Sequence, residues 1–241
     1  MTRTEDPKQL FDFEPNDPLE AEWNRQARNY LTLGFNEVLG QDGEEYLHNL
    51  PHFSQNTQEQ KRLGLTIPLL VDPRVYIRKQ MGLAGIGIIE DRKEYLKSWG
   101  FDFRDRDLFE SYELSLTKEH FVRRTEIRKT TDTTRPYSTW IQDGSKYLGK
   151  SPFMAGQEVV FAFLRGQSDE RIGSIYDGIS LAIQYPQKLR VNELIVLGTQ
   201  IGKMTPTLIS RDDKVYLGLI NDDSVVSGYK DRGLLTRSAV S

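Results

Sequence analysis

Histidine is the first residue type to test for chemistry, and the 241-residue chain has only His48, His52 and His120. His48 and His52 are four residues apart, a spacing that places two imidazoles on one face of a helix and suits a transition metal. Pro51 lies between them and is expected to break that helix, and no glutamate completes a His-Glu-x-x-His motif. The sequence therefore predicts no metal bound through histidine.

Two aspartate pairs, Asp212-Asp213 and Asp222-Asp223, form the one constellation of carboxylates that could support an enzyme. If their turns met at one end of a sheet, the four oxygen-rich groups could hold a cation. However, aspartate is also an ordinary turn residue. The strand expected between the pairs, Lys214 to Ile220, would span roughly 20–25 Å at about 3.3 Å per residue. We therefore expect two separate solvated turns, and the catalytic residues remain unknown.

Basic side chains gather only once in the chain. The members of this cluster are Arg123, Arg124, Arg128, Lys129 and Arg135. They could bind a phosphate or an acidic partner. Because Glu119, Glu126 and Asp132 are interspersed among them, the pattern is more typical of a solvated face with weak ion pairs.

Several classes of function are disfavoured by what the sequence lacks. It has no cysteine, which removes thiol catalysis, disulfides and thiolate metal ligands. No Gly-x-Ser-x-Gly motif is present, and Gly82, Gly85 and Gly87 do not have the spacing of a dinucleotide or phosphate loop. We therefore expect no cofactor.

Bulk properties limit the partners and the location. The net charge of −3 argues against a general affinity for nucleic acid or anionic membranes. No apolar run approaches the roughly 18–20 residues that cross a bilayer, and the N-terminus has no apolar signal segment. The lack of cysteine fits a reducing compartment, so a cytoplasmic location is expected, with a protein or small-molecule partner that remains unknown.

Helix start signals recur along the chain. Residues 1–16 are rich in acids and predict a mobile tail, followed by a single domain over residues 17–241. Asp17-Pro18 then begins a helix that ends near Gly34, with a buried face that includes Leu19, Trp23 and Leu31. The same cap-plus-proline pattern recurs at Asp72-Pro73 and Ser151-Pro152.

A further helix is expected from Ser174, with Asp177 as its capping-box partner, and it should stop before Pro186. Its core-facing residues are Ile175, Ile179 and Ile183, which are spaced four apart. The face expected for the helix at Ser151 is formed by Phe153, Val160, Phe163 and Leu164.

Several segments read as strands. The segment Tyr137–Ile141 precedes Asp143-Gly144 and predicts a hairpin that returns through Lys146–Leu148. Leu65–Val71 is apolar, and Pro68 within it favours an edge position. Arg211-Asp212-Asp213 joins two extended segments into another hairpin. The predicted fold class is α+β, with short helices packed on a mostly antiparallel sheet built from hairpins.

Five phrases, read in order, carry a resemblance. They are QARNYLTLGFNEVL (26–39), Ile67–Val71, YSTWIQDGSKYL (137–148), DGISLAIQYPQKL (177–189) and PTLISRDDKVYLGL (206–219). In this order they resemble a bacterial family catalogued only as a domain of unknown function, over roughly Ala21 to Ser238. Asp177 stands where that family usually has glutamate, and residues 219–233 lack the tryptophan and cysteine of typical members. The resemblance implies a bacterial cytosolic protein of one compact domain and no known activity.

Two classes of function remain open. The first is a non-catalytic binding or accessory protein, which is favoured because no nucleophile system, metal cluster or cofactor loop is recognisable. The alternative is a hydrolase or transferase whose carboxylates, Asp212, Asp213, Asp222 and Asp223, come together only in the fold. A deep pocket with two carboxylates of shifted pKa would favour the alternative, and a broad exposed apolar patch would favour the first.

Overall fold

The structure is a computed structural model. It describes both backbone and side chains for residues 17–58, 61, 64–89, 134–142, 173–189, 193–196, 199 and 204–220. It describes the backbone alone for residues 110–111, 115–116, 122–123, 170–172, 200, 221, 232–234 and 236–238.

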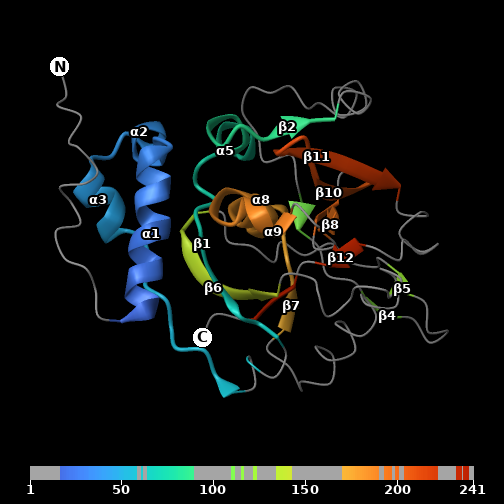
Figure 1. Cartoon of the computed structure of the whole chain (residues 1–241), viewed down its shortest axis with the longest axis horizontal. Helices are drawn as coiled ribbons and strands as arrows, with labels where there is room; N and C mark the ends of the chain where they lie inside the picture. Colours follow the sequence, from blue (N-terminus) through green and yellow to red (C-terminus); the bar gives the residue numbers. More distant parts are fainter. Residues whose placement is uncertain are drawn as a thin grey trace.

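Two sheets make up most of the β structure (Figure 1). The first sheet has the strand order β1-β6-β13-β7, formed by Ile67–Val71, Tyr137–Gln142, Thr236–Ser238 and Glu170–Ile172. The second has the order β12-β8-β10-β11-β2, formed by Arg232–Leu234, Glu193–Ile195, Met204–Arg211, Lys214–Asn221 and Gly87–Ile88. Two short pairs, β3 (Glu110–Ser111) with β9 (Thr199–Gln200) and β4 (Ser115–Leu116) with β5 (Val122–Arg123), complete the described strands.

The predicted fold class, α+β and mostly antiparallel, is confirmed. Among the described strands, only β2 with β11 and β12 with β8 pair in parallel. The β10–β11 hairpin is confirmed, with Asp212 and Asp213 in its turn at φ values of 49° and 59°. Such left-handed conformations suit a two-residue hairpin turn, and aspartate tolerates them. The first sheet differs from a sheet of hairpins, because its pairings join strands that are far apart in the sequence.

Helix α8 (Ile175–Gln184) occupies the centre of the molecule, between the two sheets (Figure 1). Its predicted capping box is confirmed, since Ser174 and Asp177 bond to each other's backbone N–H. Ile175, Ile179 and Ile183 are buried as predicted, and so is every other residue of the helix. The helix packs against β1, α5 and β10, which explains why it is buried all round. A short helix, α9 (Pro186–Leu189), follows it.

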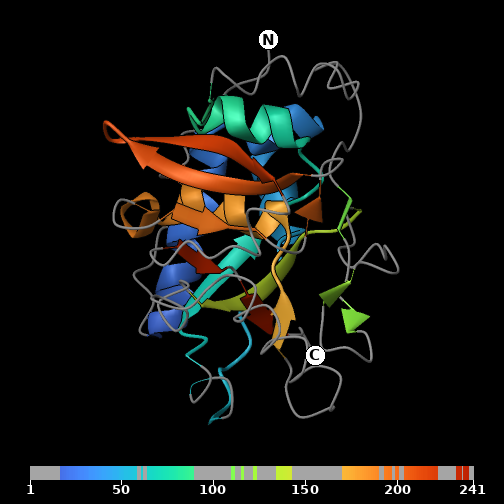
Figure 2. The ribbon, with the colours of Figure 1, turned by 90° about the vertical axis from the view of Figure 1, so that its right-hand side faces the viewer.

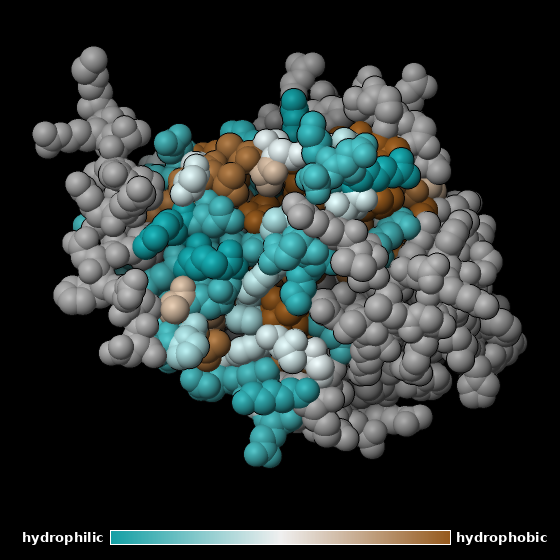
Figure 3. Space-filling view, in the orientation of Figure 1, coloured by the Kyte–Doolittle hydropathy of each residue, from teal (hydrophilic) through white to brown (hydrophobic). Residues whose placement is uncertain are grey.

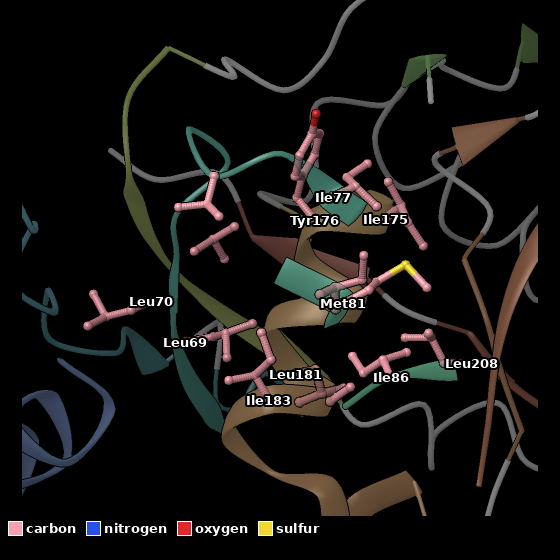
Figure 4. Close-up of a cluster of buried hydrophobic side chains, with 14 of the residues drawn as sticks. Leu69, Leu70, Ile77, Met81, Ile86, Ile175, Tyr176, Leu181, Ile183 and Leu208 are labelled. Atoms are coloured by element: carbon pink, nitrogen blue, oxygen red, sulfur yellow. The ribbon is translucent and has the colours of Figure 1, made fainter. Parts of the chain in front are cut away.

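Figure 4 shows how side chains from several elements meet around this central helix. Leu69 comes from β1, Met81 from α5 and Leu208 from β10, and they surround residues of α8 such as Leu181. All four side chains are buried. The core therefore joins segments that span residues 69 to 208 of the chain.

Helix α1 (Pro18–Thr32) covers the outer edge of the first sheet, beside β1 (Figure 1). The edge position predicted for this strand from Pro68 is confirmed. The amide of Gln26 donates to the Pro68 carbonyl oxygen at 2.8 Å and accepts from the Leu70 N–H at 2.8 Å. The Tyr30 hydroxyl donates to the Leu70 carbonyl oxygen at 2.7 Å. Side chains of α1 thus satisfy backbone groups that a further strand would otherwise bind.

Asp17 caps α1 as predicted, and Gly34 adopts a left-handed conformation just after its end. Trp23 and Leu31 are buried, whereas Leu19, which was predicted to be buried with them, is only half-buried. Leu19 lies in the first turn of the helix. Two short helices follow, α2 (Phe35–Leu39) and α3 (Gly43–His48).

The prediction that Asp72-Pro73 begins a helix is wrong. Helix α5 (Ile77–Leu83) starts later, with Tyr76 at its N-cap. The physical reason is that the Asp72 carboxylate binds the Arg74 side chain and N–H in a turn instead of capping a helix. The helix expected at Ser151-Pro152 with its apolar face, the return strand Lys146–Leu148 and the tail at residues 1–16 lie outside the described residues.

Candidate binding surface

The turn that links β1 to α5 is built around a buried ion pair. The Asp72 carboxylate is fully buried and accepts two bonds from the Arg74 guanidinium, Nε to Oδ1 at 2.9 Å and Nη2 to Oδ2 at 2.8 Å. The Arg74 side chain keeps 17% of its surface exposed. Burial alone would lower the pKa of Arg74, but the hydrogen bonds and charge of Asp72 raise it above its ordinary value. Arg74 is therefore held in one orientation as a permanent cation.

Two further residues fix this turn against its neighbours. The Gln80 side-chain amide donates to the Asp72 carbonyl oxygen, which ties the middle of α5 to the end of β1. The Arg74 Cζ atom lies 5.7 Å from the centre of the Tyr46 ring, which belongs to α3. Burial, with a smaller contribution from the Asp72 charge, raises the pKa of Tyr46 well above its usual value, so this phenol stays neutral. Helices α3 and α5 are thereby held together at the turn.

Helix α5 has two distinct faces. Ile77, Gln80 and Met81 are buried against the core, and Figure 4 shows Ile77 and Met81 among the core side chains. The opposite side, which we call the exposed face of α5, consists of Tyr76, Arg78, Lys79, Gly82 and Leu83. Tyr76 and Leu83 are 49% and 38% exposed, and they are the large hydrophobic residues that lie exposed within the described residues.

The charge on this face has one sign. Residues 73–89 include Arg74, Arg78 and Lys79 and contain no carboxylate. Asp72 neutralises Arg74, and Lys79 forms no ion pair or hydrogen bond within the part of the chain that the structure describes. In Figure 3, apolar and hydrophilic surfaces lie side by side at the upper end of the molecule, where α5 is located. The exposed face of α5 therefore combines two apolar side chains with positive charge.

The histidines do not form a site in the described residues. His48 is exposed at the end of α3, and His52 is exposed and stacks on Trp23, with ring centres 4.5 Å apart and planes 18° apart. His120 lies outside the described residues. No group of three or more His, Cys, Asp or Glu side chains that could hold a metal is found in the part of the chain described.

The predicted carboxylate and basic clusters are only partly described. Asp212 and Asp213 are exposed at the tip of the β10–β11 hairpin, and the strand that follows, Lys214–Asn221, has eight residues. Asp222 and Asp223 lie outside the described residues, so the distance between the two pairs remains a prediction. Of the basic cluster, Arg135 is exposed and Arg123 belongs to β5, while Arg124, Arg128 and Lys129 are likewise not described.

The fully buried Asp177 has a structural partner for each of its oxygens. Its Oδ2 atom accepts from the Ser174 N–H at 2.7 Å and from the Ser174 hydroxyl at 3.0 Å, and its Oδ1 atom accepts from the Tyr137 hydroxyl at 2.7 Å. Like Asp72, it is engaged in holding one element to another. The hydrogen bonds of Asp72 and Asp177 hold both carboxylates against structural partners.

Sequence reasoning missed the exposed face of α5. One signal was available, because residues 73–89 carry cations without any acid. Which of these side chains face outward depends on where the helix begins, and the sequence placed that start at Asp72-Pro73 rather than at Tyr76.

Comparisons with known proteins do not assign this geometry to a family. No family model, curated protein or solved structure matches the chain significantly. Among the helices in the described residues, none combines the length and apolar character needed to cross a membrane.

Proposed function

We propose that this protein is a non-catalytic binding protein that recognises an acidic protein segment bearing apolar side chains. The observation that carries the proposal is the exposed face of α5, where Tyr76 and Leu83 flank Lys79 on one side of a helix. Residues seven apart on a helix lie two turns apart on the same side, so both apolar groups are available to one partner. Lys79 and Arg78 supply a positive field that favours negative groups.

The rigidity of the turn supports the same proposal. A partner pays less in conformational entropy when the surface it meets is already ordered. The Asp72–Arg74 ion pair and the Gln80 bond to Asp72 fix the start and the middle of α5 before any partner arrives. Ile77 and Met81 anchor the buried face in the core.

The enzymatic alternative has less support. Asp72 and Asp177 are both occupied by structural hydrogen bonds, and Asp212 and Asp213 are exposed at a hairpin tip. An acid–base site needs carboxylates directed at a substrate in a sheltered position. These four carboxylates do not provide this arrangement.

The proposal also covers the cellular location and the family of the protein. The absence of cysteine supports a cytoplasmic location, and the ordered phrases between Ala21 and Ser238 support membership in the bacterial family of unknown function. Membership would be tested by finding a second sequence that carries the same phrases in the same order.

Binding of a synthetic peptide tests the proposal. The probe is a fluorescein-labelled helical peptide with leucine and phenylalanine on one side and glutamate on the flanks, titrated with the full chain and followed by fluorescence anisotropy. We expect a Kd between about 1 μM and 1 mM, as suits one short helix face. Lys79→Glu should weaken binding about tenfold, because the attraction between residue 79 and the peptide glutamates becomes repulsion at two exposed charge contacts.

Matched controls separate recognition from nonspecific attraction. Lys214→Glu makes the same charge change at an exposed lysine of the β10–β11 hairpin and should leave binding unchanged. A peptide whose glutamates are replaced by lysine should not bind. Equal binding of the two peptides, or equal loss with Lys79→Glu and Lys214→Glu, would contradict the proposal.

A further inference from the structure

A second exposed surface, on α2 and α3, carries charge of the opposite sign. Between Leu33 and Asn49 the chain contains four carboxylates and no lysine or arginine. These carboxylates, which we call the acidic surface of α2–α3, are Glu37, Asp42, Glu44 and Glu45, and all four are exposed. No cation pairs with any of them within the described residues.

Apolar groups accompany these acids. Val38, Leu39 and Leu47 are only partly buried where they pack on the core. The region therefore has the chemistry that the exposed face of α5 requires of a partner, which is negative charge together with accessible apolar side chains.

The α2 part of the acidic surface lies at the same end of the molecule as α5, and α3 approaches the turn that precedes α5. The contact of Arg74 with the Tyr46 ring brings α3 to the turn that precedes α5. Figures 1 and 2 both place α2 and α5 at the upper end of the molecule. A surface that carries adjacent patches of opposite charge is self-complementary, because a two-fold rotation brings each patch of one copy onto the opposite patch of the other.

We infer that the partner of the exposed face of α5 is the acidic surface of α2–α3 of a second copy of this chain, in a two-fold symmetric dimer. This inference rests on the proposed function and names the partner for the same surface. Each contact occurs twice, so Lys79 of each copy meets the acids of the other. The charge of Lys79 and the charges of the acidic surface are then neutralised together.

The size and charge of the surfaces define the expected behaviour. Two short helical patches bury an area at the low end for protein interfaces, below roughly 1,200 Å² in total, which is typical of weak complexes. Exposed charge pairs are also screened by salt. The dimer should therefore form at high protein concentration and low ionic strength, and it should dissociate as salt is added.

Sedimentation equilibrium of the full chain tests this inference. We expect a monomer–dimer equilibrium at an ionic strength of about 0.01 M, where charges act over about 30 Å, and a monomer at about 1 M, where the range is about 3 Å. A protein that is monomeric at every concentration and salt level, or a dimer that salt does not affect, would overturn the inference.

A charge exchange identifies the interface. Lys79→Glu and Glu44→Lys should each weaken dimerisation about tenfold, because each places like charges together twice. In an equimolar mixture, the mixed dimer has unlike charges at both contacts, since position 79 of each copy faces position 44 of the other. Its association should return to the wild-type level.

The result remains interpretable if a variant is less stable. Circular dichroism and the unfolding midpoint of each variant report folding separately, and Lys214→Glu provides a variant with the same charge change at a distant exposed site. Failure of the mixture to recover, with both variants folded, would overturn the inference. Peptide binding by a strictly monomeric protein would reject the dimer and leave the proposed function standing, whereas loss of both would reject both.

Discussion

The Arg74 guanidinium donates two hydrogen bonds to the carboxylate of Asp72, at 2.9 and 2.8 Å, in a turn where the aspartate has no exposed surface. The same aspartate accepts the Gln80 amide at its main-chain oxygen. One residue therefore links the end of β1, the turn and the middle of α5. The exposed face of α5 depends on this link for its position.

Arg74→Ala should reduce the free energy of unfolding by about 3–5 kcal/mol, because it leaves the Asp72 carboxylate buried without a counterion. Urea denaturation measures this change. Arg211→Ala, at an exposed position in the β10–β11 hairpin, is the matched control and should alter stability by no more than about 0.5 kcal/mol. Equal effects of the two substitutions would show that the ion pair is not structural.

Gln26→Leu tests how α1 covers the edge of the first sheet. Leucine has a similar volume but leaves the Leu70 N–H without its side-chain partner, and it removes the Gln26 bond to the Pro68 carbonyl oxygen, which the Tyr185 hydroxyl also approaches at 3.0 Å. The loss of two buried hydrogen bonds should cost at least about 2 kcal/mol. Hydrogen exchange at the Leu70 amide should accelerate as well. Asn24→Leu, on the same helix, serves as the control, and unchanged exchange at Leu70 in Gln26→Leu would reject this role.

Trp23→Ala should cost about 3–5 kcal/mol, as expected for a large buried aromatic side chain. Its indole N–H also donates to the Pro51 carbonyl oxygen at 2.9 Å, so the segment after α3 should loosen. Leu19→Ala should cost clearly less, because Leu19 is half-buried. Thermal unfolding followed by circular dichroism compares the two, and an unchanged midpoint for Trp23→Ala would reject its place in the core.

The parts of the fold that sequence reasoning predicted correctly depend on local signals. The capping box of Ser174 and Asp177, the proline start at Asp17 and the aspartate turn of the β10–β11 hairpin each involve neighbouring residues. Local hydrogen bonds and backbone preferences decide such features, so a short stretch of sequence contains the necessary information.

The parts that were not predicted depend on distant residues. Asp72 binds Arg74 in an ion pair instead of capping a helix. The pairing of β6 with β1 joins residues about seventy positions apart, as in Val71 with Tyr137. Exposure of Tyr76 and Leu83 follows from the tertiary position of α5. The candidate binding surface therefore emerged only from the three-dimensional arrangement.

The pH dependence of stability should report the contact between α1 and the end of α8. The Glu22 carboxylate accepts from the Tyr185 hydroxyl at 2.6 Å and from Arg25. Burial would raise the pKa of Glu22, but its bonds to Arg25, Tyr185 and Gln26 outweigh this and lower the pKa below its ordinary value. A carboxylate with a lowered folded-state pKa stabilises the fold above its unfolded pKa, and this contribution is lost as pH falls through the folded value.

Wild-type protein should therefore be more stable than Glu22→Gln near neutral pH, and the difference should shrink as the pH falls below about 4. At the alkaline end, burial and the Glu22 charge raise the pKa of Tyr185, so its contribution is present below about pH 10 and declines above it. Urea denaturation across this range measures both. A difference between wild type and Glu22→Gln that does not change with pH would contradict the assignment.

The most direct test of the central claim is to locate the bound acidic peptide on the protein by NMR. Amide resonances of the isotope-labelled full chain are followed as the glutamate- and leucine-bearing peptide is added. We expect shift changes concentrated at Tyr76, Arg78, Lys79 and Leu83, with none at Lys214. Shift changes centred on another surface, or a spectrum that the peptide does not alter, would contradict it.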